Sequence, residues 1–241
     1  MLFRAHRGNS AYAPENTMPA FCLALDEGFQ SIETDPNYTK DGIVVLMHDS
    51  TINRTCRNDD GSPIERPIFV TETTYEELLQ YDAGVFMGEQ FRGTRIPRLE
   101  ELLAIAEDKD VVISLDKKIA WDNMDRFFDV IERYKTRTEF SCADTKRIKT
   151  VLERFPDALI NYDGSTTEAE LEEVCSIVKN ENLTVWMYLD KPNFAWLKDR
   201  AKASPENCAR VKKYARLGIA NVTKPADVRE AYLLGADIIE V

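Results

Sequence analysis

Residues 31–48 read SIETDPNYTKDGIVVLMH, two extended runs separated by a Lys-Asp-Gly turn at residues 40–42. An Asp-Gly pair between extended runs is typical of a hairpin, so we expect residues 43–48 to be the hairpin partner of residues 31–35. Alternate side chains of a strand point to the same side, so Glu33 and Asp35 share one face. The stretch therefore predicts a strand that ends in two neighbouring carboxylates.

Outward from this stretch, apolar strand candidates alternate with helical stripes along almost the whole chain. The stripes show i, i+3, i+4 spacing, as in Met18, Phe21 and Cys22. With residues 43–48 counted as a hairpin partner, eight strands remain. They are residues 2–6, 31–35, 111–115, 139–142, 158–162, 183–189, 219–222 and 237–241.

Eight strands in βα alternation predict a TIM (β/α)8 barrel that forms a single domain of residues 1–241. A doubly wound open sheet is the alternative, but no Gly-x-Gly-x-x-Gly motif follows any of the strands. A polar helical stretch follows residues 183–189. The sequence stops on its last strand, so we expect the usual eighth helix to be missing.

Residues 50–97 interrupt the alternation and are rich in Asp, Asn, Gly, Pro, Arg and Thr. The motif TYEE at residues 74–77 has the pattern of a capping box and predicts a short helix. The segment is too long for a loop without structure of its own, so we expect a small inserted subdomain over one mouth of the barrel. Its aromatic residues could shape the mouth of the site or fill the core of the insertion, and we favour the core: Tyr75, Tyr81, Phe86 and Phe91.

The composition limits the class of partner. The chain has 31 basic and 42 acidic residues, a formal net charge of −11. Nucleic acids and anionic membrane surfaces attract clustered Lys and Arg, so neither is expected as a main partner. A small phosphorylated substrate needs only a local positive site and remains open, as does the oligomeric state.

The five cysteines are odd in number and dispersed, without Cys-x-x-Cys or metal-ligand spacing. Cys22 and Cys175 fall in apolar stripes, so we expect buried, reduced thiols there. No stretch is long and apolar enough to span a membrane, and no charged-then-apolar leader precedes His6. These features favour a cytoplasmic protein; a mature secreted form is the alternative.

The chain contains two histidines, His6 and His48, and both end predicted strands. Active sites of such barrels lie at the carboxyl ends of the strands, where Glu33, Asp35 and Asp116 also fall. Because the imidazole pKa lies near neutrality, the two histidines suit an acid/base pair. The alternative is that scarce histidines happen to end two strands and that the carboxylates only pair with nearby Lys or Arg.

Three carboxylates would form an all-oxygen site, which suits Mg²⁺ or Ca²⁺ better than zinc. Arg7 and Lys118 are placed to face a bound anion, as a bidentate fork and a point charge. A divalent cation, the guanidinium of Arg7 and two histidines together are suited to phosphodiester cleavage. The cation and Arg7 would neutralise charge on the phosphoryl oxygens, while the histidines exchange protons with the attacking and leaving oxygens.

The motifs form an ordered series that is dense over residues 5–55, returns at 96–101 and is thinner afterwards. They are AHRG (5–8), PENT (14–17), AF (20–21), IETD (32–35), TKDG (39–42), HD (48–49), RT (54–55) and IPRLEE (96–101). This series resembles the signature of the glycerophosphodiester phosphodiesterases. The resemblance implies an α/β barrel with a small insertion and a divalent metal. It also implies hydrolysis of glycerophosphodiesters to glycerol 3-phosphate and an alcohol such as choline, a step of glycerol and lipid metabolism.

Residue by residue, the resemblance implies three sets of roles: His6 and His48 as the acid/base pair, Glu33 and Asp35 as metal ligands, and Arg7 and Lys118 as phosphate contacts. The third metal carboxylate of the family is usually Glu in a Glu-x-Lys motif; Asp116 takes that place here, one methylene shorter.

Two later segments depart from the family pattern. Residues 186–189 read WMYL and keep only the Trp of a usual Trp-Thr-Val-Asn, and the final motif is GADIIEV at 235–241. Both departures lie in the half that lines the substrate pocket, so they bear on substrate identity more than on reaction class. We expect Trp186 either to stack on the organic portion of the substrate or to pack in the core.

Two other functions stay open. One is a phospholipase D-like enzyme that acts on lysophospholipids through the same site with a wider apolar mouth. The other is a non-catalytic barrel that holds a phosphoryl ligand without turnover; the missing end helix favours it, and the presence of both histidines argues against it.

Overall fold

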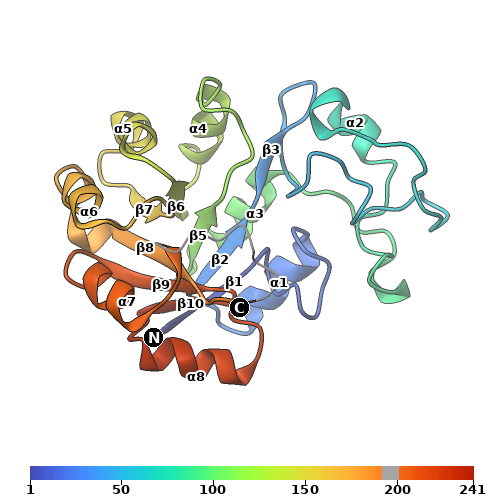
Figure 1. The fold of residues 1–241 in the computed structure, drawn as a ribbon. Helices are drawn as coiled ribbons and strands as arrows, with labels where there is room; N and C mark the ends of the chain where they lie inside the picture. Colours follow the sequence, from blue (N-terminus) through green and yellow to red (C-terminus); the bar gives the residue numbers. More distant parts are fainter. Residues whose placement is uncertain (192–200) are drawn as a thin grey trace. The chain divides into compact units, whose positions relative to one another are not determined.

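The computed structural model describes residues 1–191 and 201–241 (Figure 1). Its main strands follow the order β1-β10-β9-β8-β7-β6-β5-β2 of a closed barrel. Each of these eight strands matches one that the sequence predicts, so the barrel is confirmed and the open-sheet alternative is not. Part of the predicted polar helical stretch after Leu189, residues 192–200, lies outside the described residues.

The chain divides into two compact units, Ala5–Arg137 and Met1–Arg4 with Thr138–Val241. In the first, β2 and β5 pair in parallel, with Glu33 opposite Ser114 and Thr34 opposite Leu115. A second, antiparallel sheet pairs β3 with β4. The strands of this unit are β2 (Ser31–Thr34), β3 (Pro36–Tyr38), β4 (Val44–Leu46) and β5 (Val112–Leu115). Its α-helices are α1 (Met18–Asp26), α2 (Tyr75–Leu78), α3 (Leu99–Ala106) and α4 (Asp125–Ile131).

In the other unit, parallel ladders join β6 to β7, β7 to β8, β8 to β9, β9 to β10 and β10 to β1. The strands are β1 (Leu2–Ala5), β6 (Arg137–Cys142), β7 (Leu159–Tyr162), β8 (Leu183–Tyr188), β9 (Arg216–Ala220) and β10 (Ile238–Glu240). The helices that alternate with them are α5 (Thr145–Arg154), α6 (Glu168–Cys175), α7 (Pro205–Val211) and α8 (Pro225–Leu233).

The predicted hairpin forms, but its pairing differs from the prediction. β2 ends at Thr34, and the partner of β4 is the short strand β3, with Pro36 opposite Leu46. Proline has no N–H for a ladder, and here it begins an edge strand, a position that tolerates it. The sequence predicts that residues 36–38 only connect the two strands of the hairpin. In the structure they leave the barrel and form the small sheet with β4. The hydrogen bond from Met47 N to Asp35 O, 2.9 Å, ties the end of the hairpin back to β2.

The inserted segment forms a hydrophobic cluster that also includes a residue of β4. Buried side chains of residues 45–96 form this cluster, and Tyr75 and Tyr81 pack against it as predicted. Thr74 caps α2 through the predicted capping box with Glu77. Phe86 and Phe91 are not among the side chains of this cluster, and the Arg57 guanidinium lies 5.9 Å from the ring centre of Phe86.

The cysteine prediction is only partly right. None of the five cysteines forms a disulfide, but Cys22 is exposed and Cys175 is only half-buried. Helix α1 buries Ala20, Phe21 and Ala24, and successive residues are about 100° apart around a helix, so Cys22 turns away from that face. Among the described residues, no helix combines the length and hydropathy needed to cross a bilayer.

Candidate active site

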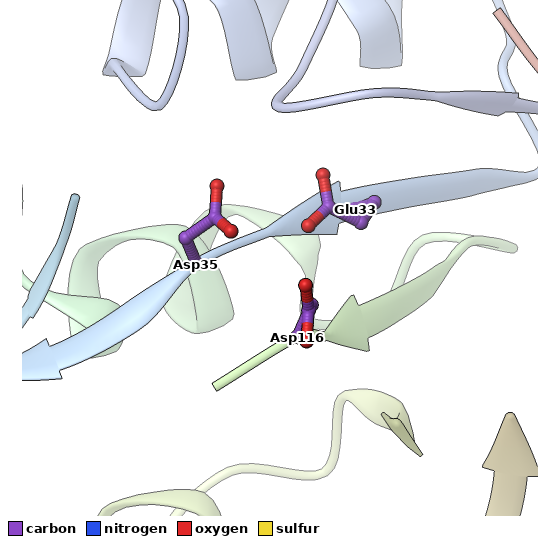
Figure 2. Close-up of side chains that lie close together, drawn as sticks. All are labelled: Glu33, Asp35 and Asp116. Atoms are coloured by element: carbon purple, nitrogen blue, oxygen red, sulfur yellow. The ribbon is translucent and has the colours of Figure 1, made fainter. Parts of the chain in front are cut away.

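The three predicted metal-binding carboxylates lie together, within the unit Ala5–Arg137. Glu33 belongs to β2, Asp35 follows that strand, and Asp116 follows β5. The parallel pairing continues one step beyond the strands, because Asp116 N donates to Thr34 O at 3.0 Å. One oxygen of each carboxylate lies within 4.8 Å of the other two (Figure 2). Glu33 and Asp35 are buried, whereas the Asp116 side chain is 48% exposed.

The turn after β1 brings Arg7 against two of these carboxylates. Arg7 has a left-handed backbone, φ 56°, and Gly8 follows with φ 78°. A Cβ on Gly8 would lie 2.8 Å from Ala20, so the turn needs glycine for both backbone and space. Arg7 N donates to Glu33 at 2.9 Å, and Arg7 Nε lies 3.3 Å from Asp35 Oδ2. His6 is half-buried and directly precedes Arg7, which is held through both its backbone and its side chain.

Asn16 fixes Asp35 from the other side and was not predicted as a site residue. Its amide donates to Asp35 Oδ2 at 2.7 Å, while its Oδ1 accepts from the Thr34 hydroxyl at 2.8 Å and from Asp35 N at 3.2 Å. Asn16 is buried and left-handed, φ 55°, a conformation that Asn adopts more readily than most residues. The PENT motif was the available signal, but it identified a family pattern and not this contact.

Lys118 joins two of the carboxylates. Its Nζ lies 2.9 Å from Asp35 Oδ1 and 2.8 Å from Asp116 Oδ2. Burial opposes the charge on Lys118, but the attraction of Asp35 and Asp116 outweighs it and holds the lysine pKa above its ordinary value. Lys118 therefore stays a permanent cation beside the carboxylate cluster.

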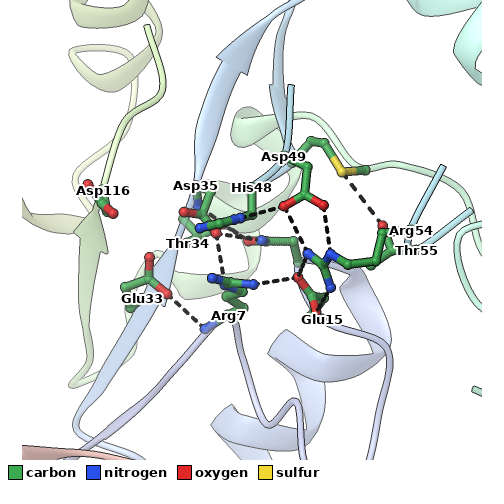
Figure 3. A network of polar contacts seen from close by, with 12 residues as sticks. Arg7, Glu15, Glu33, Thr34, Asp35, His48, Asp49, Arg54, Thr55 and Asp116 are labelled. Atoms are coloured by element: carbon green, nitrogen blue, oxygen red, sulfur yellow. Dashed lines mark hydrogen bonds and ion pairs between the residues drawn. The ribbon is translucent and has the colours of Figure 1, made fainter. Parts of the chain in front are cut away.

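His48 lies at the end of a chain of charged contacts (Figure 3). Its Nδ1 is 2.6 Å from Asp49 Oδ1. Arg54 donates to both oxygens of Asp49, at 2.6 and 3.1 Å, and to both oxygens of Glu15, at 2.7 and 2.8 Å. Glu15 in turn accepts from Arg7 at 2.8 Å. This chain connects the imidazole to the arginine that contacts Asp35.

Both carboxylates of this chain are ionised at neutral pH. The hydrogen bonds from Arg54 lower the pKa of Asp49 to about 2, against an opposing effect of burial and with help from His48. For Glu15 burial is the largest effect and raises the pKa, but Arg54 and Arg7 together lower it to about 2. An ionised Asp49 has no proton to donate, so the contact with His48 requires a proton on Nδ1.

Trp186 belongs to the other unit, where it is 4% exposed. Its indole N–H donates to Asn161 at 2.8 Å, and the Arg4 guanidinium carbon lies 4.1 Å from its ring centre. These contacts are with the protein's own side chains. The predicted substrate contact of Trp186 stays a prediction.

The donor set fits a hard divalent cation. All three ligand groups are carboxylates, and buried Asp35 Oδ1 accepts no hydrogen bond of good geometry from the described residues, although Lys118 contacts it. Carboxylate oxygens are the ligands that Mg²⁺ and Ca²⁺ prefer in proteins, so the chemistry of these three groups fits such an ion.

Sequence reasoning did not assign roles to Glu15, Asn16, Asp49 or Arg54. Each belongs to one of the motifs PENT (14–17), HD (48–49) or RT (54–55). The spacing of these motifs along the chain gives no hint that Arg54 spans Glu15 and Asp49, since residues 15 and 54 come from different connections.

The glycerophosphoryl diester phosphodiesterase family model matches residues 6–179. A glycerophosphodiester phosphodiesterase of Caldanaerobacter subterraneus is 43% identical over 117 residues, 48% of this chain and 45% of that protein. The matches span about half the length of the curated relatives.

Two solved structures have a similar fold. A phosphodiesterase of Oleispira antarctica, in complex with the product sn-glycerol-3-phosphate, has a TM-score of 0.78 at 20% identity, covering 100% of this chain and 92% of that one. A glycerophosphoryl diester phosphodiesterase of Parabacteroides distasonis has a TM-score of 0.75 at 22% identity, covering 99% and 81%. The family match covers well over half of the sequence, and the chain therefore belongs to the glycerophosphoryl diester phosphodiesterase family.

Proposed function

We propose that the protein hydrolyses glycerophosphodiesters to glycerol 3-phosphate and an alcohol, with a divalent cation, Mg²⁺ or Ca²⁺, at the carboxylate cluster. The observation that carries the proposal is the cluster itself, three carboxylates with Arg7 and Lys118 in direct contact. Family membership supports the reaction class, and the product bound to the Oleispira relative supports the substrate class.

Glu33, Asp35 and Asp116 would hold the cation. When bound, it supplies positive charge to a phosphoryl oxygen and so stabilises the transition state. Arg7 and Lys118 would bind the remaining non-bridging oxygens, Arg7 through its fork and Lys118 as a point charge. Arg7 and Asn16 hold Asp35 on two sides, so the geometry exists before substrate arrives.

The two imidazoles would move the protons. Either water or a hydroxyl group of the substrate attacks phosphorus, and one imidazole takes the proton of the attacking oxygen. The bond from phosphorus to the alcohol oxygen breaks, and the other imidazole protonates the departing alkoxide; if the substrate hydroxyl attacks, water then opens the cyclic phosphate. In His48 the proton on Nδ1 faces Asp49, so Nε2 is the nitrogen that exchanges a proton with substrate. An imidazole can accept or donate, and exchange with solvent restores both histidines after each turnover.

Hydrolysis of glycerophosphocholine with and without chelator tests the metal part of the proposal. We expect chelation to abolish activity and Mg²⁺ or Ca²⁺ to restore it, and Glu33→Gln to lower kcat by about a hundredfold or more. Asp110→Asn is the matched control, because Asp110 is fully exposed and pairs only weakly with Arg137, at 3.6 Å. Activity that survives both chelation and Glu33→Gln would contradict a metal site here.

The histidines are tested separately. His6→Ala and His48→Ala should each lower kcat by about 10²–10⁴-fold. Full activity of either variant would sink its acid/base role. Tight phosphate binding without turnover under either cation would favour the non-catalytic barrel, and faster cleavage of lysophosphatidylcholine than of glycerophosphocholine would favour the phospholipase D-like enzyme.

We also propose a cytoplasmic location. The support is the set of five free cysteines, which suits a reducing compartment. Fractionation of the source cells tests it, and recovery of the protein outside the cytoplasm would contradict it.

A further inference from the structure

Glu15 binds two arginines at once. Its Oε1 accepts from both Arg7 and Arg54, at 2.8 Å each, and its Oε2 accepts from Arg54 at 2.7 Å. The Glu15 side chain is 18% exposed and Arg7 is 16% exposed, so this pair is shielded from water and from screening ions. The two guanidinium groups approach each other only because the carboxylate stands between them.

Arg54 binds two carboxylates in the same way. Its Nε and Nη2 bond to Asp49, and its Nη1 and Nη2 bond to Glu15. Among the described residues, Arg54 is the group that hydrogen-bonds to both Glu15 and Asp49. The planar fork fixes the two carboxylates in one orientation relative to each other, which a lysine could not do. Asp49 is thereby prevented from turning away from His48.

We propose that Glu15 and Arg54 are positioning residues that couple the orientation of the His48–Asp49 pair to that of Arg7. The inference rests on the proposed function, since it assigns His48 to proton transfer and Arg7 to phosphate. Asp49 selects the Nδ1–H form of His48, Arg54 holds Asp49 in place, and Glu15 holds Arg54 together with Arg7. This relay of contacts, Arg7–Glu15–Arg54–Asp49–His48, thus fixes the proton-transfer group and the phosphate-binding group relative to each other.

The first test reads the imidazole and not the reaction. The chain has two histidines, so ¹⁵N spectra of the ring nitrogens contain few signals, and His6→Ala and His48→Ala assign them. In the wild type we expect neutral His48 to be fixed with its proton on Nδ1. Glu15→Gln and Arg54→Ala should convert this to an exchanging mixture of both forms. An unchanged His48 tautomer in both variants would overturn the relay.

The second test is a double-mutant cycle on kcat for glycerophosphocholine with saturating cation. Glu15→Gln and Asp49→Asn should each lower kcat about 10- to 100-fold, and the double variant should lose at least about fivefold less than the product of the two losses. Losses that multiply would contradict a relay, since Glu15 and Asp49 would then act independently. In an Arg54→Met background we expect the coupling to disappear.

Two controls separate positioning from general damage. Glu89→Gln breaks an Arg92–Glu89 fork of the same kind, at 2.7 Å twice, in the exposed part of the insertion, and should leave kcat and the His48 tautomer unchanged. Arg54 is 47% exposed, so ethylguanidinium should reach the space left by Arg54→Ala and restore activity at least about fivefold. A lack of rescue together with a fixed His48 tautomer would make Arg54 merely structural.

The tests separate failure of the relay from failure of the proposed function. A wild type that does not cleave glycerophosphocholine contradicts the proposed function, while the tautomer measurement still decides the relay. An active wild type whose Glu15→Gln variant keeps full kcat contradicts the relay alone.

Discussion

Each compact unit contains a partly buried cluster of arginines and carboxylates, and the charge balance of the two clusters differs. In the unit that contains β6–β10, Arg4 pairs with Glu139 and lies 4.0 Å from Glu240, and Arg216 lies 3.9 Å from Glu139. Two guanidinium groups thus face two carboxylates. The charges cancel, and Arg4 and Glu139 are almost completely buried.

Counted at formal charges, the cluster in Ala5–Arg137 contains more carboxylates than fixed cations. Its three permanent cations, Arg7, Arg54 and Lys118, face five carboxylates: Glu15, Glu33, Asp35, Asp49 and Asp116. The excess of two equals the charge of one divalent cation. Buried ion pairs are common to both clusters, so burial alone does not mark a site. The formal residual charge distinguishes the cluster that is proposed to bind a cation from the balanced cluster of Arg4 and Glu139.

The largest expected effect comes from Asp35→Asn. The substitution removes a proposed metal ligand and the partner of Arg7 and Lys118, so kcat for glycerophosphocholine should fall by about a thousandfold or more. Calorimetric titration with Mg²⁺ should show weaker binding, because the excess charge is halved. Wild-type Mg²⁺ affinity in this variant would contradict the charge argument, even if kcat were low.

Glu139→Gln probes the balanced cluster, and we expect it to lower stability strongly while kcat hardly changes. Arg4 would be left buried without its carboxylate, which should cost about 3 kcal/mol or more in the free energy of unfolding, measured in urea. The kcat of the remaining folded protein should stay within about twofold of the wild type. Asp157→Asn, which breaks an exposed pair with Lys179, should leave the free energy of unfolding almost unchanged, because solvent screens that pair. A large loss of kcat in Glu139→Gln would show that the two clusters are not functionally distinct.

The sequence was sufficient to predict the eight strands and the carboxylate cluster for a common physical reason. Period-2 and period-3.6 patterns report burial locally, and residues at the ends of neighbouring parallel strands meet whatever the loops do. Glu33 and Asp116 could be placed together from this rule alone. The pairing of β3 with β4 could not, because a strand of three residues carries too short a pattern to separate from a turn.

The supporting contacts follow no such rule. Asn16 reaches Asp35, and Arg54 reaches Glu15, because particular connections fold back on the strand ends. Side-chain hydrogen bonds between residues about 20 to 40 positions apart depend on the three-dimensional path of those connections. No periodicity of the sequence encodes that path. The sequence therefore shows which charged residues are present, but it does not predict which of them contact one another.

Asn16 offers a smaller effect that separates backbone from side chain. Asn16→Gly keeps the left-handed backbone but removes the hydrogen bonds to Thr34 and Asp35; we expect a loss of about 1–2 kcal/mol in stability and about 10- to 100-fold in kcat. Asn16→Ala should lower stability by about a further 1 kcal/mol because of its left-handed conformation, with the same kcat. Urea unfolding and steady-state kinetics measure both. A lower kcat in Asn16→Ala than in Asn16→Gly would mean that strain, and not the lost amide, disturbs Asp35.

The smallest expected effect is the pH dependence of the Glu15 contribution to stability. The pKa of Glu15 falls from 4.5 to about 2 on folding, so its interactions stabilise the protein above pH 4.5 and are lost as the pH falls towards 2. Arg54 is half exposed, so water screens its charge. We therefore expect a full contribution of only about 1–2 kcal/mol. The free energy of unfolding of the wild type minus that of Glu15→Gln, measured in urea without added cation, should be constant from pH 7 to 6 and should fall by about half or more by pH 3. The balanced cluster cannot produce this difference, since Glu139 is present in both proteins. A difference that stays the same from pH 7 to 3 would mean that Glu15 is already paired in the unfolded chain or is not held by its two arginines.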